Sequence, residues 1–490
     1  MMNQMEISRG AERLKRPAII GFILICATFT GVLIARWGFM VELFLVALPL
    51  LLIILTAIFL RPGLGLYLVF VLNYFALGIY RYLNMIPWGL TVDILLVITY
   101  LSLVLQMFHR KVEWGRARND LVLLAALWFL YSFLEMLNPE AGSRVAWFYS
   151  VRGISLYMIL TIPLVFVIFH RRSDMRMFFL LWGIFSLMGS LKGIQQKFIG
   201  LDPWEQRWLD EGGAAQHLLF GELRIFSFFS DAGQFGAAQG MAGVVFGILA
   251  LGEKNRRRKL FYAMVALPAL YSMMISGTRG AISVPFAGIL LYIVMKKNYK
   301  VMTIGLAALV AVFVFFNYTF IGQSNSTIRR MRTAFNPEDA SLQTRLTNQQ
   351  RIKGYLSSRP FGGGVGSTGS VGQKYNPGSF LSTVPTDSWY VMIWMEEGVV
   401  GLVLHLCILA YILGKAAFLA MFRLKNESVR TPVMAMAAGM AGIMVASYGN
   451  PVLGQMPVGI ILYTCMAFMF MAPAFDREIT TEQALTLQTA

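Results

Sequence analysis

Long apolar segments follow one another along most of this chain, and short polar connections separate them. An α-helix rises 1.5 Å per residue, so a run of about 20 apolar residues is long enough to cross a bilayer. The segments are continuous and do not alternate with polar residues, which excludes a β-barrel and predicts an all-α polytopic membrane protein. About fourteen transmembrane helices are predicted, at residues 18–35, 40–60, 63–80, 88–108, 119–137, 154–169, 177–199, 234–252, 260–276, 281–295, 301–318, 388–413, 433–449 and 456–472.

Basic residues gather in alternate connections between these segments. They lie before residue 18 and at residues 110–118, 171–172, 254–259, 296–297 and 415–430. Lys and Arg in short loops are retained on the cytoplasmic side, so the alternation predicts that both termini are cytoplasmic. The one long polar segment then lies outside, because long loops cross the membrane regardless of charge.

These predictions divide the chain into four regions. They are residues 1–320 with eleven helices and short loops, the large external loop 321–387, residues 388–472 with three helices, and a polar, disordered cytoplasmic tail at 473–490. The N-terminus has basic residues before the first apolar segment but no convincing signal-peptide cleavage site. The first segment is therefore predicted to be a helix that is retained.

Composition supports the membrane class and limits the chemistry. The chain is 57% hydrophobic with a mean hydropathy of +0.63, far too apolar for a soluble protein. Its net charge of +17 lies mostly in short loops, where it sets orientation and does not indicate a nucleic-acid partner. The three cysteines show no metal-ligand spacing, and the chain has no phosphate-binding Gly-Lys loop. The sequence therefore predicts no metal and no cofactor.

The external loop contains a predicted helix with an arginine on its apolar face. Asn336-Pro337-Glu338-Asp339 is a typical helix start, and Arg359-Pro360 ends the helix after about residue 358. One face carries Leu342, Leu346, Ile352 and Leu356. Arg345 falls on the same face, where a guanidinium needs an anionic partner. The alternative is a helix lying on lipid with Arg345 extended to water.

Other cations are predicted on the same outer side. Arg279 lies in the minimal turn Ser276–Ala281, and Arg224 precedes an apolar segment. An Arg at membrane depth costs about 2.5–3.5 kcal/mol unless it is paired, which indicates function, although an interfacial anchor is the alternative. Arg152, Arg351 and Lys192 could join the same cluster, and for Lys192 an anchor is again the alternative. Asp93 and Glu135 could each pair with an arginine.

A cluster of arginines facing outward implies an anionic substrate that enters from lipid. A sugar carried on a lipid pyrophosphate meets both conditions, because arginines would bind the pyrophosphate and stabilise the charge that grows as the sugar leaves. A base would then take a proton from the attacking hydroxyl.

Four segments together resemble one family, the O-antigen ligase and polymerase superfamily. They are Arg224-x-x-Ser with Phe229, Ser276-Gly277-Thr278-Arg279-Gly280-Ala281, Thr344-Arg345 with Pro360-Phe361-Gly362-Gly363-Gly364, and Glu397-Gly398-Val399-Val400-Gly401. Their order, spacing and sidedness carry the resemblance, which covers about residues 218–401.

The resemblance implies a GT-C-like glycosyltransferase of the bacterial inner membrane with its active site facing the periplasm. Such enzymes move a glycan from undecaprenyl pyrophosphate to lipid A-core (ligase), to another lipid-linked chain (polymerase) or to a protein hydroxyl (O-oligosaccharyltransferase). The reaction is expected to be inverting and metal-independent, and ligase is the favoured expectation here. Arg224 and Arg279 match the family's functional arginines, as does Arg345.

The sequence departs from the family at one position. The family usually places a His, followed by a small polar residue, at the end of the large loop, whereas this chain has Asp387 followed by Ser388. We hypothesise that Asp387 is the base, since a carboxylate can accept a hydroxyl proton. Asp387 could also cap the helix predicted after it, and both roles can hold together.

Two other classes of protein compete with the enzyme. A transporter of lipid-linked glycans predicts inverted repeats and charges at mid-membrane, whereas this sequence shows no repeat and its charges gather at the outer surface. An anion channel would suit an arginine-rich mouth, but the large asymmetric loop argues against it.

Overall fold

The computed structural model describes residues 17–83, 87–219, 221–332 and 340–489. Within them, eleven helices are long and apolar enough to cross a membrane. Each of the fourteen predicted segments overlaps a helix. α13 is not among these eleven because the basic residues of its first turn lower its mean hydropathy. α2 and α3 are not among them because their apolar stretches are shorter. The all-α polytopic class is confirmed, and the number of crossings stays a prediction.

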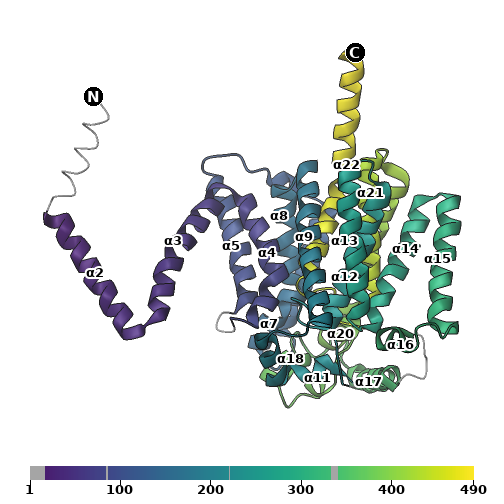
Figure 1. Ribbon diagram of the computed structural model, residues 1–490, viewed down its shortest axis with the longest axis horizontal. Helices are drawn as coiled ribbons and strands as arrows, with labels where there is room; N and C mark the ends of the chain where they lie inside the picture. Colours follow the sequence, from purple (N-terminus) through teal and green to yellow (C-terminus); the bar gives the residue numbers. More distant parts are fainter. Residues whose placement is uncertain (1–16, 84–86, 220, 333–339, 490) are drawn as a thin grey trace.

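Figure 1 shows the long helices together with the short α7, which leads into α8. They are α2 (Pro17–Trp37), α3 (Phe39–Leu60), α4 (Pro62–Tyr80), α5 (Trp88–Gln106), α6 (Asp120–Leu134), α7 (Arg144–Val151), α8 (Tyr157–Ile168), α9 (Arg172–Phe198), α12 (Ala232–Gly252), α13 (Arg256–Ile275), α14 (Ser283–Lys296), α15 (Tyr299–Tyr318), α20 (Trp389–Phe418), α21 (Glu427–Ala446) and α22 (Val458–Thr489). α2 projects away from the bundle at the N-terminal edge, and α3 leads back from it to pack against α4 and α5 (Figure 1).

Shorter elements connect these helices. They are α10 (Pro203–Trp208), α11 (Ala214–His217), α16 (Ser326–Arg332), α17 (Ala340–Leu356), α18 (Gly369–Tyr375), α19 (Phe380–Thr383), and the one-turn helices η1 (Trp114–Ala117), η2 (Glu135–Leu137), η3 (Arg152–Leu156), η4 (Leu209–Gly213), η5 (Arg279–Ile282) and η7 (Leu419–Arg423). Strands β1 (Leu218–Leu219) and β2 (Glu222–Leu223) pair antiparallel, with Leu218 opposite Leu223.

The centre of the bundle is built from α12, α21 and α22, which are buried over most of their apolar length. Small residues let these helices approach closely. A Cβ atom on Gly442 of α21 would lie 2.6 Å from the carbonyl oxygen of Val284, and one on Gly288 of α14 would lie 2.8 Å from that of Ala438. In a membrane, where lipid is as apolar as leucine, such close packing is a main source of helix association.

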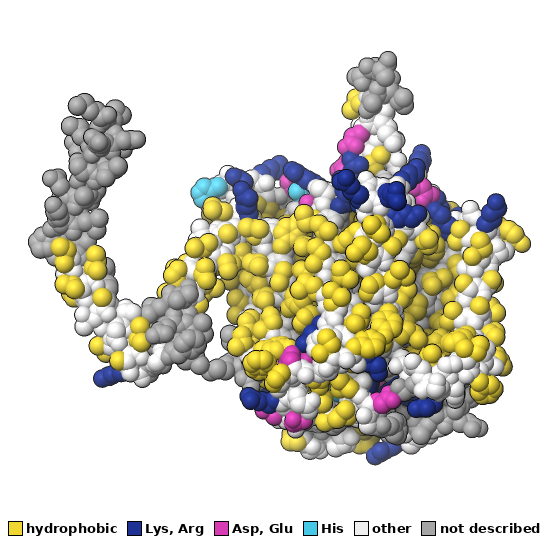
Figure 2. All heavy atoms as spheres, in the orientation of Figure 1, with side chains coloured by type: hydrophobic (Ala, Val, Ile, Leu, Met, Phe, Trp, Pro, Cys, Tyr) yellow, Lys and Arg dark blue, Asp and Glu magenta, His cyan; other side chains and the backbone are white. Residues whose placement is uncertain are grey.

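The basic connections at residues 110–118, 171–172, 254–259, 296–297 and 415–430 meet at one end of the bundle, which we call the basic face, while the basic residues before the first helix lie outside the described residues. Ion pairs join Arg172 to Glu482 at 2.7 Å and Lys296 to Glu427 at 3.3 Å, and Lys415 pairs with Asp120. Figure 2 shows Lys and Arg side chains gathered there, above a broad apolar band. The expectation of a disordered tail is wrong, because α22 continues as a helix past this face to Thr489.

The opposite end, which we call the loop face, holds α11 and α16 to α18 (Figure 1). α17 confirms the predicted loop helix, while its expected start at residues 336–339 lies outside the described residues. Its apolar face is only half buried: Ile352 and Leu356 are enclosed, but Leu346 is 41% exposed. Only the C-terminal half of α17 packs into the small core under the loop, with Leu381, Val384 and Met395.

Candidate active site

The segment leading into α12 places Arg224 beside the turn after α13. The Arg224 amide donates to the carbonyl of His217 at 2.8 Å, which continues the β1–β2 hairpin. The guanidinium Nη2 donates to Oγ1 of Thr278 at 2.9 Å, and that hydroxyl donates to the carbonyl of Ala232 at 2.8 Å. Two of the predicted motifs, distant in the sequence, are therefore joined by a hydrogen bond.

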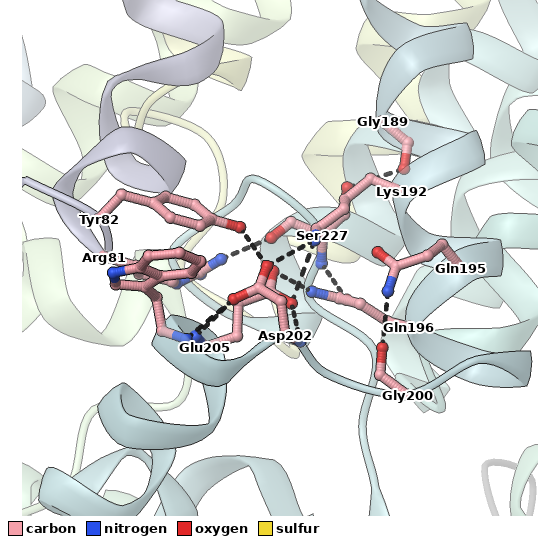
Figure 3. A network of polar contacts seen from close by, with 11 residues as sticks. Arg81, Tyr82, Gly189, Lys192, Gln195, Gln196, Gly200, Asp202, Glu205 and Ser227 are labelled. Atoms are coloured by element: carbon pink, nitrogen blue, oxygen red, sulfur yellow. Dashed lines mark hydrogen bonds and ion pairs between the residues drawn. The ribbon is translucent and has the colours of Figure 1, made fainter.

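Arg81 holds the rest of this segment from α4. Its guanidinium donates to the carbonyls of Ser227 and Phe229 and lies 4.3 Å from the ring centroid of Phe226 and 4.5 Å from that of Trp208. Gln196 accepts the Ser227 amide at 2.8 Å. Figure 3 shows Arg81 and Gln196 reaching the same stretch of chain. Ser227 adopts φ = 52°, so these contacts keep a non-glycine residue in the left-handed region.

The turn between α13 and η5 is tightly packed. Gly277 adopts φ = +63°, and the Thr278 amide donates to Oγ of Ser276 at 3.2 Å. A Cβ atom on Gly277 would lie 3.7 Å from Nε of Arg330, so the side chain of Arg330 covers this turn. Arg279 follows as the first residue of η5.

Three guanidinium groups crowd one another here. Burial, and after it the positive charge of Arg330, lowers the pKa of Arg224 to about 10; Arg279 acts in the same direction and Asp231 opposes them. Burial and then Arg279 also lower the pKa of Arg330, against Glu222. Each group thus lies in the positive field of its neighbours, which favours an anion between them.

Arg345 of α17 reaches the same turn from the external loop. A Cβ atom on Gly449 would lie 3.9 Å from Nη1 of Arg345 and 3.9 Å from the Cα atom of Gly280. We call Arg224, Arg279, Arg330 and Arg345 the arginine cluster. Its members come from four separate segments, and all four segments meet at the loop face.

Asp387 lies next to this cluster. One carboxylate oxygen is 3.2 Å from Nε of Arg345, and the side chain is 54% exposed, so it can meet a substrate. The expectation that Asp387 caps the following helix is wrong. The N-cap of α20 is Ser388, whose hydroxyl accepts the Val391 amide at 3.4 Å, because the helix begins one residue later than that role requires.

The glycine run anchors the external loop to a break in α20. Gly398 has φ = +69°, and a Cβ atom there would lie 2.0 Å from the carbonyl oxygen of Pro360. Buried Glu396 accepts the amides of Gly366 at 3.0 Å and Thr368 at 3.3 Å. The Pro-Phe-Gly-Gly-Gly stretch, which follows α17, therefore packs directly against the Glu-x-Gly stretch of α20, the helix that follows Asp387.

The remaining predicted cations have other partners. Lys192 lies 3.0 Å from Asp202 and 3.2 Å from Glu205, in the network of Figure 3. Arg152 lies 2.9 Å from Asp93, which confirms an arginine partner for that acid. Arg351 is exposed, with its guanidinium 6.0 Å from the ring centroid of Phe380. The structure places Lys192 and Arg152 in pairs of their own and does not bring them into the arginine cluster.

Sequence reasoning missed two residues at this site. Arg330 is one of three arginines near the start of the external loop, and that basic run was the only signal for it. Arg81 follows an apolar segment directly, which is also the pattern of a common interfacial anchor. Its contacts depend on residues more than 120 positions away and leave no local signal.

Part of this chain is similar to a known protein family and to a curated relative. Residues 263–406 match the family model described as O-antigen ligase. A curated relative from Salmonella muenchen, an O-antigen polymerase, is 26% identical over 228 residues, which are 44% of this chain and 52% of the relative. The chain thus matches about half the length of that relative. The family match includes three members of the arginine cluster and Asp387, while Arg224 precedes it.

Proposed function

We propose, from the premise that this chain belongs to the O-antigen ligase and polymerase superfamily, that it transfers a glycan from a lipid pyrophosphate to an acceptor hydroxyl. The observation that carries the proposal is the meeting of Arg224, Arg279, Arg330 and Arg345 beside Asp387 at the loop face. A pyrophosphate is the anion that needs several guanidinium groups at once, and its lipid would remain in the bilayer beside the bundle.

The arginine cluster would stabilise the leaving group. As the bond between the sugar C1 and the pyrophosphate oxygen breaks, negative charge grows on that oxygen. Guanidinium groups held in place by the fold act on this charge without reorganising, and the effect is largest where burial limits water. Thr278 keeps Arg224 in position, and the side chain of Arg330 covers the turn that carries Arg279.

Asp387 would act as the base. The acceptor hydroxyl attacks C1 from the face opposite the pyrophosphate, which inverts the anomeric centre, and its proton passes to the Asp387 carboxylate. The proton then leaves to water while the lipid pyrophosphate is released. Arg345, whose Nε is 3.2 Å from Asp387, would orient the base and contact the donor with its remaining N–H groups.

The acceptor is proposed from the two matches. O-antigen ligation to lipid A-core is the first candidate, supported by the description of the matched family. Polymerisation onto another lipid-linked chain is the second, supported by the name of the matched relative. Undecaprenyl pyrophosphate is the proposed carrier, with the loop face in the periplasm and the protein in the inner membrane of a bacterium.

Purified protein in lipid vesicles, supplied with an undecaprenyl-pyrophosphate-linked glycan and lipid A-core, tests the proposal. Mass analysis distinguishes glycosylated lipid A-core from longer lipid-linked chains and from glycosylated protein. Transfer to any of these hydroxyls that stops in Asp387→Asn supports the enzyme. Movement of the donor across the vesicle without a new glycosidic bond would instead make the protein a transporter.

A further inference from the structure

The basic face contains a cavity of about 500 Å³, which we call the basic cavity. It lies between the first turns of α9, α13 and α21, the end of α12, and the part of α22 that continues past the bundle. Phe179 and Leu249 contribute apolar surface. Its volume is within the usual range for small-molecule sites, about 300–1,000 Å³.

The lining of the basic cavity is positive. Four basic side chains line it, namely Arg172, Arg176, Lys254 and Arg258. Two carboxylates also line it, and both are engaged. Glu253 lies 3.4 Å from Arg258 and accepts the Asn255 amide, whereas Glu427 lies 3.3 Å from both Lys296 and Arg430, which are not part of the lining.

The start of α21 forms another wall of the cavity. Its first turn lines the cavity through Glu427, Ser428 and Val429. Just before this turn, the Asp476 carboxylate accepts the amides of Lys425 at 3.2 Å and Asn426 at 2.8 Å, and the Val429 amide donates to the carbonyl of Asn426 at 3.0 Å. The positive character of the cavity therefore comes from its four basic side chains.

Two carboxylates of the C-terminal helix α22 lie close to one of the four basic side chains of the cavity, Arg172. Glu482 approaches Arg172 with both oxygens, at 2.7 and 2.8 Å, and Glu478 approaches it at 3.7 Å. Both acids are more than half exposed, and the neighbouring Ile479 and Gln483 line the cavity. The tail thus contributes its own anions at the edge of the basic cavity.

From these observations we propose that the basic cavity is a second binding site, separate from the arginine cluster, for a phosphate-bearing anion. The phosphate would bind Arg176 and Lys254, and it would compete with Glu482 for Arg172. The same chemistry is offered by free phosphate and by the headgroup of an anionic lipid. The proposal does not depend on the proposed glycan transfer.

Binding to the full-length protein tests this site with two probes. The first is inorganic phosphate, titrated against detergent-solubilised protein by thermal shift. The second is phosphatidic acid, retained by the protein in native mass spectrometry, with phosphatidylcholine as the neutral reference. Binding of phosphate alone indicates a free anion, and binding of phosphatidic acid alone or of both indicates a lipid headgroup; each supports the site when the variants described next place that binding in the basic cavity. Binding of neither probe overturns it.

Variants locate the binding. Arg176→Ala with Lys254→Ala should weaken binding about tenfold or more, since hydrogen bonds to charged groups are lost. Arg110→Ala with Arg118→Ala removes the same charge from exposed positions near the same face and should leave binding unchanged. Equal weakening in both pairs would overturn the site by showing diffuse attraction. Glu482→Gln removes the nearer of the two carboxylates at Arg172 and should tighten binding severalfold, which keeps the proposal testable if the first pair fails to fold. Unchanged or weaker binding would contradict it.

Discussion

Two groups of cations lie close together at the loop face, and they differ in what surrounds them. In the network of Figure 3, Lys192 meets two carboxylates, and Arg81 meets two carbonyl oxygens and two aromatic rings. In the arginine cluster, Arg224 has Arg330 and Arg279 as neighbours, and their charges oppose its own. Both groups have polar or anionic partners within the fold. They differ in that Arg224 and Arg330 also lie in the positive field of neighbouring arginines, which an added anion would lower.

We expect this difference to separate cations that stabilise the structure from cations that bind the proposed ligand. Sequence alone places Arg81, Lys192, Arg224 and Arg279 near the outer ends of apolar segments, where they look alike. Removing a cation from the network should cost stability, and removing one from the arginine cluster should cost binding or transfer. The following experiments test that division, beginning with the largest expected effect.

Asp387→Asn should lower the rate of glycan transfer by about 10²–10⁴-fold, because an amide cannot accept the hydroxyl proton. The fold should persist, since Ser388 and not Asp387 caps α20. The rate is measured under single-turnover conditions with lipid-linked donor. Glu140→Gln is the matched control, because Glu140 also pairs with an arginine near the loop, Arg359, at 3.1 Å. Equal loss in both variants would remove Asp387 from the reaction.

Arg81→Met should lower the free energy of unfolding by about 2–5 kcal/mol, because two buried carbonyl groups lose a charged donor. Chemical denaturation or thermal melting in detergent measures this loss. Activity per folded molecule should fall much less than stability. A stable Arg81→Met protein that has lost transfer would show that Arg81 acts on the substrate. It would contradict the division between the two groups of cations.

Arg345→Ala should lower kcat/KM by about 10–100-fold, because a charged hydrogen-bond donor to the substrate is lost and the base loses its partner. Lys353→Ala is the matched control, since Lys353 is an exposed cation on the same helix. Steady-state transfer over a range of donor concentrations separates the two constants. A decrease of the same size in both variants would indicate a general effect of charge on the loop.

Pyrophosphate should stabilise the wild-type protein against thermal unfolding, by about 2.7 kcal/mol when its concentration is 100 times its Kd. Part of this stabilisation should be lost in Arg330→Met but kept in Arg329→Met, which removes the exposed neighbour. Arg176→Ala should also keep the Arg330-dependent part, because Arg176 lines the separate basic cavity. Identical stabilisation of all four proteins would argue against an anion site at the arginine cluster.

Acid should weaken the network of Figure 3 within a defined range of pH. Burial alone would raise the pKa of Asp202, but hydrogen bonds from Tyr82 and the Glu205 amide, together with Lys192, lower it to about 2. Its unfolded value is about 3.9, so its contribution is present above about pH 4 and is lost as the pH falls towards 2. The melting temperature of wild type should therefore fall more steeply over this range than that of Asp202→Asn. Asp210→Asn, which changes an exposed carboxylate nearby, should follow wild type.

The apolar periodicity determined most of the helices, because burial in lipid depends on the residues of each segment alone. Every predicted segment overlaps a helix, and the basic connections meet at one face as the charge alternation required. Arg279 in the Ser276–Ala281 turn and Arg345 in the loop helix could also be recognised from the sequence, because a charge next to apolar residues is costly unless it has a partner.

Only the tertiary structure decided which partner each cation meets. Arg345 meets Asp387 across 42 residues, and Arg81 meets Ser227 across 146. Lys192 is neutralised by two acids, Ser388 caps α20, and the tail continues as a helix. An ion pair or a cap depends on positions that chain packing sets to within about an ångström, and periodicity along the sequence carries no information at that scale.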